Sequence, residues 1–81
     1  MKTATPFYDT AGNELYPGDK ITIVTDCNYI HRNGQKAVLI WNEKLGMYRF
    51  TYTIEYNGKK FSSEDDFHGI IEFRKGWEYG Q

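Results

Sequence analysis

The most regular feature of the sequence is the alternation of apolar and polar residues in short segments. It is clearest at residues 47–56, where every second residue from Tyr48 to Tyr56 is apolar and the intervening residues are mostly polar. Successive side chains of a β-strand point to opposite faces, so this pattern is typical of a strand. No long segment shows the spacing of an amphipathic helix. The predicted strands are residues 20–25, 36–41, 47–56, 59–61 and 70–74.

Turn signals separate these segments. The dipeptide Asn57-Gly58 predicts a two-residue hairpin turn, because Asn and Gly both tolerate the positive φ that such turns need. Residues 42–46 predict a longer hairpin loop, and residues 26–34 predict a long polar loop that ends at Asn33-Gly34. Residues 62–67 predict one helical turn, since a serine can cap free amides and the carboxylates that follow favour the positive end of the helix dipole.

Five short strands with one short helical turn before the last predict an all-β fold, namely a small SH3-like barrel. A single domain would span residues 1–81. Closure of the sheet would remove the exposed edges that make small sheets prone to association. An OB-like barrel is the alternative, but it generally needs more residues and a helix between its third and fourth strands. The sequence therefore favours the SH3-like arrangement.

Composition agrees with one folded domain. The 81 residues are 40% apolar and carry a net charge of −1, which is too apolar and too neutral for a disordered segment. No apolar run long enough to span a membrane and no apolar leader is visible, so we expect a soluble protein of the cytoplasm. A small domain needs its large rings buried. The rings expected in the core are Trp41, Tyr48, Tyr52, Tyr56 and Phe73.

Candidate catalytic and metal-binding residues are few. Cys27 and His31 have a Cys-x3-His spacing and His68 lies elsewhere, but a structural zinc site needs four ligands and the chain has no other Cys or His. A thiol–imidazole dyad from the same residues lacks any local protease or transferase motif. We therefore expect a protein that is not an enzyme and that needs no metal or cofactor.

Aromatic and basic residues occur together at two places outside the regular alternation. Tyr29, His31 and Arg32 fall in the long loop, and Arg74 and Trp77 lie near the end of the chain. In SH3-like barrels the loop after the first strand and the segment near the last strand often converge on one face. Rings combined with arginine are typical of protein interfaces and of sites that stack bases or planar ligands. These five residues are the predicted binding site.

The first third of the sequence resembles the opening of small phage and prophage β-barrel proteins of the YopX-like type. Those proteins begin with an aromatic-Asp pair, a glycine turn and an apolar residue, followed by Gly-Asp before a β-branched strand. The corresponding residues here are Tyr8-Asp9, Gly12, Leu15, Gly18-Asp19 and Ile21-Thr22-Ile23. The resemblance implies an SH3-like fold, a phage or prophage origin and thus the cytoplasm of the host cell. It implies no enzymatic activity.

Together these observations predict a non-catalytic module that binds a host protein and could inhibit a host or defence factor. The first alternative is an oligomeric protein that binds a small, nucleotide-like molecule between subunits. The second is a binder of single-stranded nucleic acid, which the net charge disfavours although a local basic patch could exist. That patch would comprise Lys59, Lys60, Arg74 and Lys75. No membrane partner is expected, and a homo-oligomer is compatible with these readings.

Overall fold

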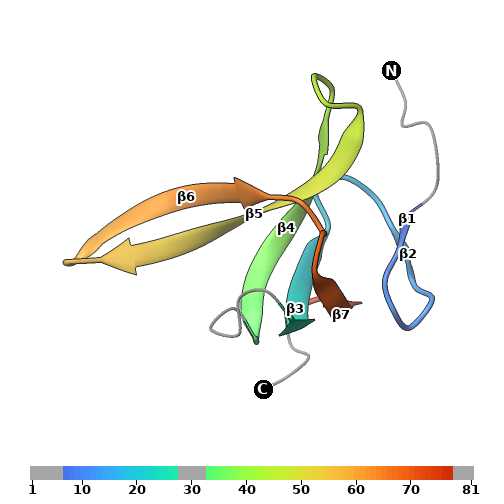
Figure 1. Cartoon of the computed structure of the whole chain (residues 1–81), viewed down its shortest axis with the longest axis horizontal. Coiled ribbons are helices and arrows are strands. Elements are labelled where there is room, and N and C mark those ends of the chain that lie inside the picture. Colours follow the sequence, from blue (N-terminus) through green and yellow to red (C-terminus); the bar gives the residue numbers. More distant parts are fainter. Residues whose placement is uncertain (1–6, 28–32, 78–81) are drawn as a thin grey trace.

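The computed structural model describes residues 7–27 and 33–77, and within these ranges every regular element is a β-strand (Figure 1). The strands are β1 (Phe7–Tyr8), β2 (Glu14–Leu15), β3 (Lys20–Asp26), β4 (Gln35–Asn42), β5 (Met47–Tyr56), β6 (Lys59–Asp65) and β7 (Ile70–Lys75). One sheet pairs β1 with β2, and a five-stranded antiparallel sheet has the order β6-β5-β4-β3-β7. The predicted all-β class is confirmed. None of the described segments forms a helix that could span a membrane.

The strands of the large sheet are those that alternation predicts, with differences at their ends. β5 has the predicted bounds, and β3, β4 and β7 are slightly longer than expected. The helical turn predicted at residues 62–67 is wrong, because β6 continues to Asp65. β6 pairs with β5 in continuous register from Tyr56↔Lys59 to Phe50↔Asp65. A long neighbouring strand offers a ladder of backbone partners, and this outweighs the local capping preference of serine.

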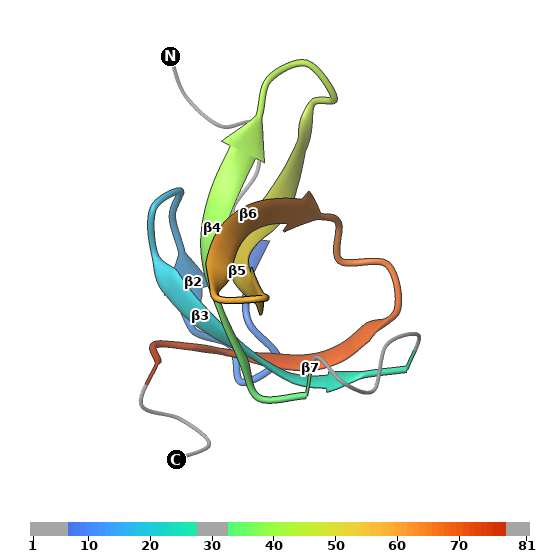
Figure 2. The ribbon, with the colours of Figure 1, turned by 90° about the vertical axis from the view of Figure 1, so that its left-hand side faces the viewer.

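The large sheet does not close into a barrel within the described residues. β6 and β7 are the two ends of a linear strand order and are not neighbours in it. Figure 2 shows the sheet strongly curled, with β3 and β7 running across the direction of β4 and β5. The structure thus shows a curled, open five-stranded sheet and a separate two-stranded sheet, which is a coarser result than the predicted SH3-like barrel.

The core is built from apolar side chains of β2, β3, β4, β5 and β7. Its buried members are Leu15, Ile21, Ile23, Ala37, Leu39, Tyr48, Phe50 and Phe73, and Phe7, Trp41, Tyr52, Phe67 and Ile70 pack against them. The expected core positions of Tyr48 and Phe73 are confirmed, and Trp41 and Tyr52 are partly buried. The expectation for Tyr56 is wrong, since 67% of this residue is exposed. β5 continues past the core, so the last residues of its apolar face reach solvent.

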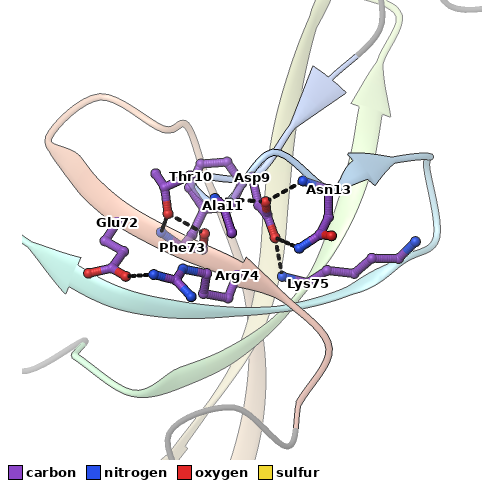
Figure 3. Close-up of polar contacts among 8 residues, drawn as sticks. All are labelled: Asp9, Thr10, Ala11, Asn13, Glu72, Phe73, Arg74 and Lys75. Atoms are coloured by element: carbon purple, nitrogen blue, oxygen red, sulfur yellow. Dashed lines mark hydrogen bonds and ion pairs between the residues drawn. The ribbon is translucent and has the colours of Figure 1, made fainter.

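The outer edge of β7 is covered by the turn between β1 and β2 (Figure 3). The backbone N–H and the hydroxyl of Thr10 donate to the carbonyl oxygen of Phe73 at 3.1 and 2.8 Å. The backbone N–H of Lys75 donates to Oδ2 of Asp9 at 2.8 Å. An open strand edge is a template for association. At β7 the turn takes the place of a further strand.

The buried Asp9 carboxylate organises this turn. Its oxygens accept hydrogen bonds from the backbone N–H groups of Ala11, Asn13 and Lys75 at 2.8–2.9 Å. They also accept one from Nδ2 of Asn13 at 3.0 Å. Burial disfavours the charged form and acts to raise the pKa of Asp9, but the hydrogen bonds, led by those of Asn13, outweigh burial. The pKa of Asp9 is therefore lowered, and the folded turn holds an ionised carboxylate.

β5 and β6 extend beyond the core as a two-stranded hairpin, and we call the exposed residues 53–62 the hairpin arm (Figure 1). The turn at its tip is Asn57-Gly58, where φ is 54° and 76°. Positive φ at both central residues is characteristic of a type I′ turn. The predicted two-residue hairpin and its register are therefore confirmed.

The substitution Gly58→Val should destabilise the hairpin arm by more than about 1 kcal/mol, because a β-branched residue at positive φ is strained. The matched control is Gly58→Asn, since Asn tolerates this backbone region. The arm can open without global unfolding, so amide hydrogen exchange in β5 and β6 is the appropriate measurement. Equal protection in both variants would show that the turn does not determine the stability of the arm.

Candidate functional site

A shallow groove lies between β1, the loop that joins β4 to β5, and the segment that joins β6 to β7. Its volume is about 710 Å³. We call it the aromatic groove, and its lining residues are Phe7, Trp41, Gly46, Met47, Tyr48, Asp66, Phe67 and His68. Aromatic rings make up half of this lining, so the groove offers apolar contact surface more than charge.

Ring packing holds the walls of the aromatic groove. Phe7 stacks on Tyr48 with ring centroids 4.6 Å apart and lies 5.1 Å from Phe67. Trp41 meets Tyr48 edge-on at 4.9 Å, and Phe67 meets the buried Phe50 edge-on, also at 4.9 Å. Aromatic pairs at such separations attract one another beyond the effect of burial. Because these rings are continuous with the core, the groove walls are formed before any partner binds.

The loop between β4 and β5 positions one end of the groove. The backbone N–H of Gly46 donates to the carbonyl oxygen of Asn42 at 2.8 Å, and that of Leu45 donates to Oδ1 of Asn42 at 2.9 Å. Met47 follows directly and is 37% exposed. A methionine side chain is flexible and polarizable, so it adapts to irregular apolar surfaces. This end of the groove is therefore an adaptable apolar contact.

Asp66 and His68 form the polar end of the groove. The backbone N–H of His68 donates to Oδ1 of Asp66 at 3.1 Å, and the backbone N–H of Asp66 donates to Oδ1 of Asp65 at 2.8 Å. The same turn is closed by the N–H of Ile70, which donates to the carbonyl oxygen of Phe67 at 3.0 Å. These bonds order the segment that carries the Phe67 ring and leave His68 exposed at the rim.

The described ranges contain no group of three or more His, Cys, Asp or Glu side chains that could hold a metal ion. Cys27 is exposed, and its backbone N–H donates to the carbonyl oxygen of Gly69 at 2.9 Å. His31, the nearest histidine in sequence, lies outside the described residues. Among the described residues, the aromatic groove is the candidate site.

Three of the predicted binding residues, Tyr29, His31 and Arg32, lie outside the residues that the structure describes. Arg74 is in β7, where it forms an ion pair with Glu72 (Figure 3). Its pairing within one strand explains the position of the guanidinium without a ligand. The predicted patch that joins the long loop to the end of the chain stays a prediction.

Trp77, the remaining predicted site residue, packs back onto the sheet. Its indole N–H donates to the carbonyl oxygen of Ala37 at 2.7 Å, and Nζ of Lys20 lies 5.0 Å from the ring centroid. It lines a smaller hollow of about 260 Å³ together with residues of β4, β5 and β6, among them Val38, Thr51 and Ser62. Trp77 therefore fastens the segment after β7 to β3 and β4, and it is not among the residues that line the aromatic groove.

Interpretation of the sequence missed the aromatic groove. Phe7 precedes the first predicted strand, and Phe67 lies in the segment predicted as a helical turn. One feature of the sequence could have indicated the groove. The face of β5 that is otherwise polar begins with a methionine. The residues of that face are Met47, Arg49, Thr51, Thr53 and Glu55. A large apolar residue on a solvent-facing strand surface is a candidate contact residue.

Comparison of the chain with protein-family models, with curated proteins and with solved structures gave no match.

Proposed function

We propose that this protein is a non-catalytic binding module that holds an apolar side chain of a protein partner in the aromatic groove. The observation that carries the proposal is the preformed wall of Phe7, Trp41 and Phe67 with the exposed Met47 at its end. Binding energy at protein interfaces concentrates in such aromatic anchors, and rigid walls reduce the entropy lost on binding.

The lining of the groove favours a protein over the two alternatives. Single-stranded nucleic acid needs basic side chains near its phosphates, and neither lysine nor arginine lines the groove, whereas Asp66 does. A small ligand is usually enclosed on most sides, and this groove is shallow. A polypeptide segment can cover such a surface and also contact its polar end at His68.

The biological setting that we propose rests on the resemblance to YopX-like proteins. It places the protein in a phage or prophage and its partner among host proteins, with inhibition of a host or defence factor as the consequence of binding. On the same basis we propose that the open sheet is a variant of the SH3-like barrel in which β6 and β7 remain apart. Both proposals rest on that resemblance, because fold alone does not determine function.

The substitution Met47→Arg should weaken partner binding by placing a charge at the apolar end of the groove. The matched control is Leu45→Arg, because Leu45 is in the same loop, is 57% exposed and does not line the groove. Quantitative affinity capture from host lysate should recover one protein with wild type and with Leu45→Arg. The recovered amount should fall about tenfold or more with Met47→Arg, as expected for loss of an energetically important contact of the interface.

Two outcomes would contradict this proposal. Equal capture by both arginine variants would show that binding does not use the groove. A rise in melting temperature with nucleotides, abolished by Met47→Arg, would indicate the small-ligand alternative instead, because a ligand stabilises the state that it binds.

A further inference from the structure

One edge of the large sheet is covered by another part of the chain, and within the described ranges the other edge is open. β7 has its outer backbone groups bound by Asp9 and Thr10, as described above. β6 is the other end of the strand order, and no described strand lies beyond it. Its residues 59–62 are exposed. An open edge of this length is a site for pairing with another strand unless something prevents it.

The register of the hairpin arm shows which backbone groups of β6 face outward. In a two-residue hairpin the pair that flanks the turn, Tyr56↔Lys59, is hydrogen-bonded across the strands. Hydrogen-bonded and non-hydrogen-bonded pairs alternate along an antiparallel ladder. The N–H and C=O groups of Lys60, Ser62 and Glu64 therefore point away from β5, toward the open edge.

The sequence of β6 is complementary to itself in the antiparallel direction. It reads Lys-Lys-Phe-Ser-Ser-Glu-Asp, so that the first two residues are basic and the last two are acidic. If two copies align with Ser62 opposite Ser62, Lys60 faces Glu64 and Lys59 faces Asp65, and each pair occurs twice by symmetry. This is also the register that uses the whole strand, and its pairs Ser62–Ser62 and Lys60–Glu64 join residues whose backbone groups point outward.

We propose that the protein forms a two-fold symmetric dimer in which β6 pairs antiparallel with β6 of a second copy, so that the two sheets become continuous. A closed two-fold interface uses one surface patch on both partners, which a self-complementary strand satisfies. Parallel pairing would place lysine against lysine and glutamate against glutamate, and like charges directly opposite are unfavourable. The charges of β6 therefore select both the partner and the direction.

The charge of Glu64 is maintained by its own chain. Hydrogen bonds from Nδ2 of Asn42, at 2.9 Å, and from Arg49 lower the pKa of Glu64. The carboxylate thus remains ionised across the neutral range. Arg49 and Asn42 hold the Oε2 atom, and the residue as a whole stays exposed, so a lysine of a second copy can approach it.

The opposite face of the hairpin arm contributes apolar contact to the same dimer. Phe61 is 50% exposed and lies beside Ile54, its partner in β5, which is 43% exposed. In the proposed register Phe61 faces Ser63 of the second copy, and the two phenylalanines become diagonal neighbours, within reach of aromatic side chains. A single strand edge is a small interface, so the dimer is expected to be weak and dependent on concentration.

Complementary charge variants test this proposal. Lys59→Glu/Lys60→Glu makes β6 acidic at both ends, and Glu64→Lys/Asp65→Lys makes it basic at both ends. Sedimentation velocity from about 10 μM to about 1 mM covers the range of a weak interface. The dissociation constant of the dimer should be at least about tenfold higher for each variant alone than for wild type, because opposite charges across the strands become like charges. An equimolar mixture of the two should regain the dimer, because every cross-strand pair is again of opposite charge.

Two controls show whether an effect on the dimer comes from β6 itself. Lys44→Glu/Lys75→Glu makes the same charge change on exposed lysines outside β6 and should leave the dimer intact. If the basic variant fails to fold because it loses the contacts of Glu64, Ser62→Pro replaces it. Proline removes an outward N–H that β5 does not use, and prolines are tolerated on open edges. Ser62→Ala is its control.

The proposal is supported by a wild-type dimer that both charge variants weaken and their mixture restores, or that Ser62→Pro abolishes and Ser62→Ala retains. It is overturned by a wild-type protein that stays monomeric at the highest concentration. It is also overturned by a dimer that persists in the acidic variant and in Ser62→Pro, since such a dimer would use another surface. None of these results depends on the aromatic groove.

Discussion

The substitution Phe50→Ala is expected to lower the free energy of unfolding by about 3–5 kcal/mol, the usual cost of removing a buried phenylalanine ring. Phe50 is fully buried and supports the groove residue Phe67 at 4.9 Å. A domain of this size has a total stability of about 4–12 kcal/mol, so the variant should lose a large part of it and unfold at a lower urea concentration than wild type. Urea denaturation followed by circular dichroism measures the change.

Phe61→Ala is the matched control for this experiment, because it removes the same ring from a half-exposed position on the hairpin arm. It should cost less than about 1 kcal/mol, in the range of exposed cross-strand contacts. A similar loss in both variants would mean that the core does not centre on Phe50. Loss only in Phe61→Ala would mean that the hairpin arm folds onto an apolar layer.

The second large effect is expected for Asp9→Ala, which should cost about 3 kcal/mol, since four hydrogen bonds to a buried, charged acceptor are lost. The donors belong to Ala11, Asn13 and Lys75, so the loss would also release the turn from the outer edge of β7. Asp19→Ala is the control. Asp19 accepts one backbone hydrogen bond, from Tyr16 at 2.8 Å in an exposed turn, and its loss should cost about 1 kcal/mol.

The effect of Asp9 should depend on pH with a defined sign. The folded protein lowers the pKa of Asp9, so folding favours the ionised form. The stabilisation is therefore fully present above the unfolded pKa of about 3.9 and is lost as pH falls through the lower folded pKa. The difference in unfolding free energy between wild type and Asp9→Ala should shrink as the pH falls below about 4. A difference that does not change with pH would exclude a charged Asp9 as the organiser of the turn.

Local pattern predicted the large sheet well, because alternation and turn chemistry are local properties. The bounds of β5 and the type I′ turn at Asn57-Gly58 follow directly from the order of residues. The extension of β6 through Ser62 and Ser63 did not follow, since it depends on β5 being long enough to pair with these residues. A capping pattern that is correct locally was overridden by a partner strand.

The candidate site was less predictable than the fold, because it is assembled from distant parts of the chain. Phe7, Tyr48 and Phe67 meet only when β1 and the segment after β6 come to the same end of β5. In the sequence, Phe7 lies near the start of the chain, Tyr48 lies in a predicted core strand, and Phe67 lies in a segment that resembles the start of a helix. Trp77, by contrast, was predicted as a site residue because it is an isolated ring near a basic segment. In the structure its indole N–H donates to the carbonyl oxygen of Ala37.

The two tryptophans allow one measurement to test directly whether the aromatic groove is the binding surface. Trp41 lines the groove and Trp77 lies outside it, so the two indole N–H signals in a nitrogen-15 correlation spectrum report on separate places. On titration with the captured partner, the Trp41 indole and the amides of Met47 and His68 should shift, and the Trp77 indole should remain in place. Shifts at the Trp77 indole and in β7, with the Trp41 indole unchanged, would contradict the groove and place binding at the end of the chain.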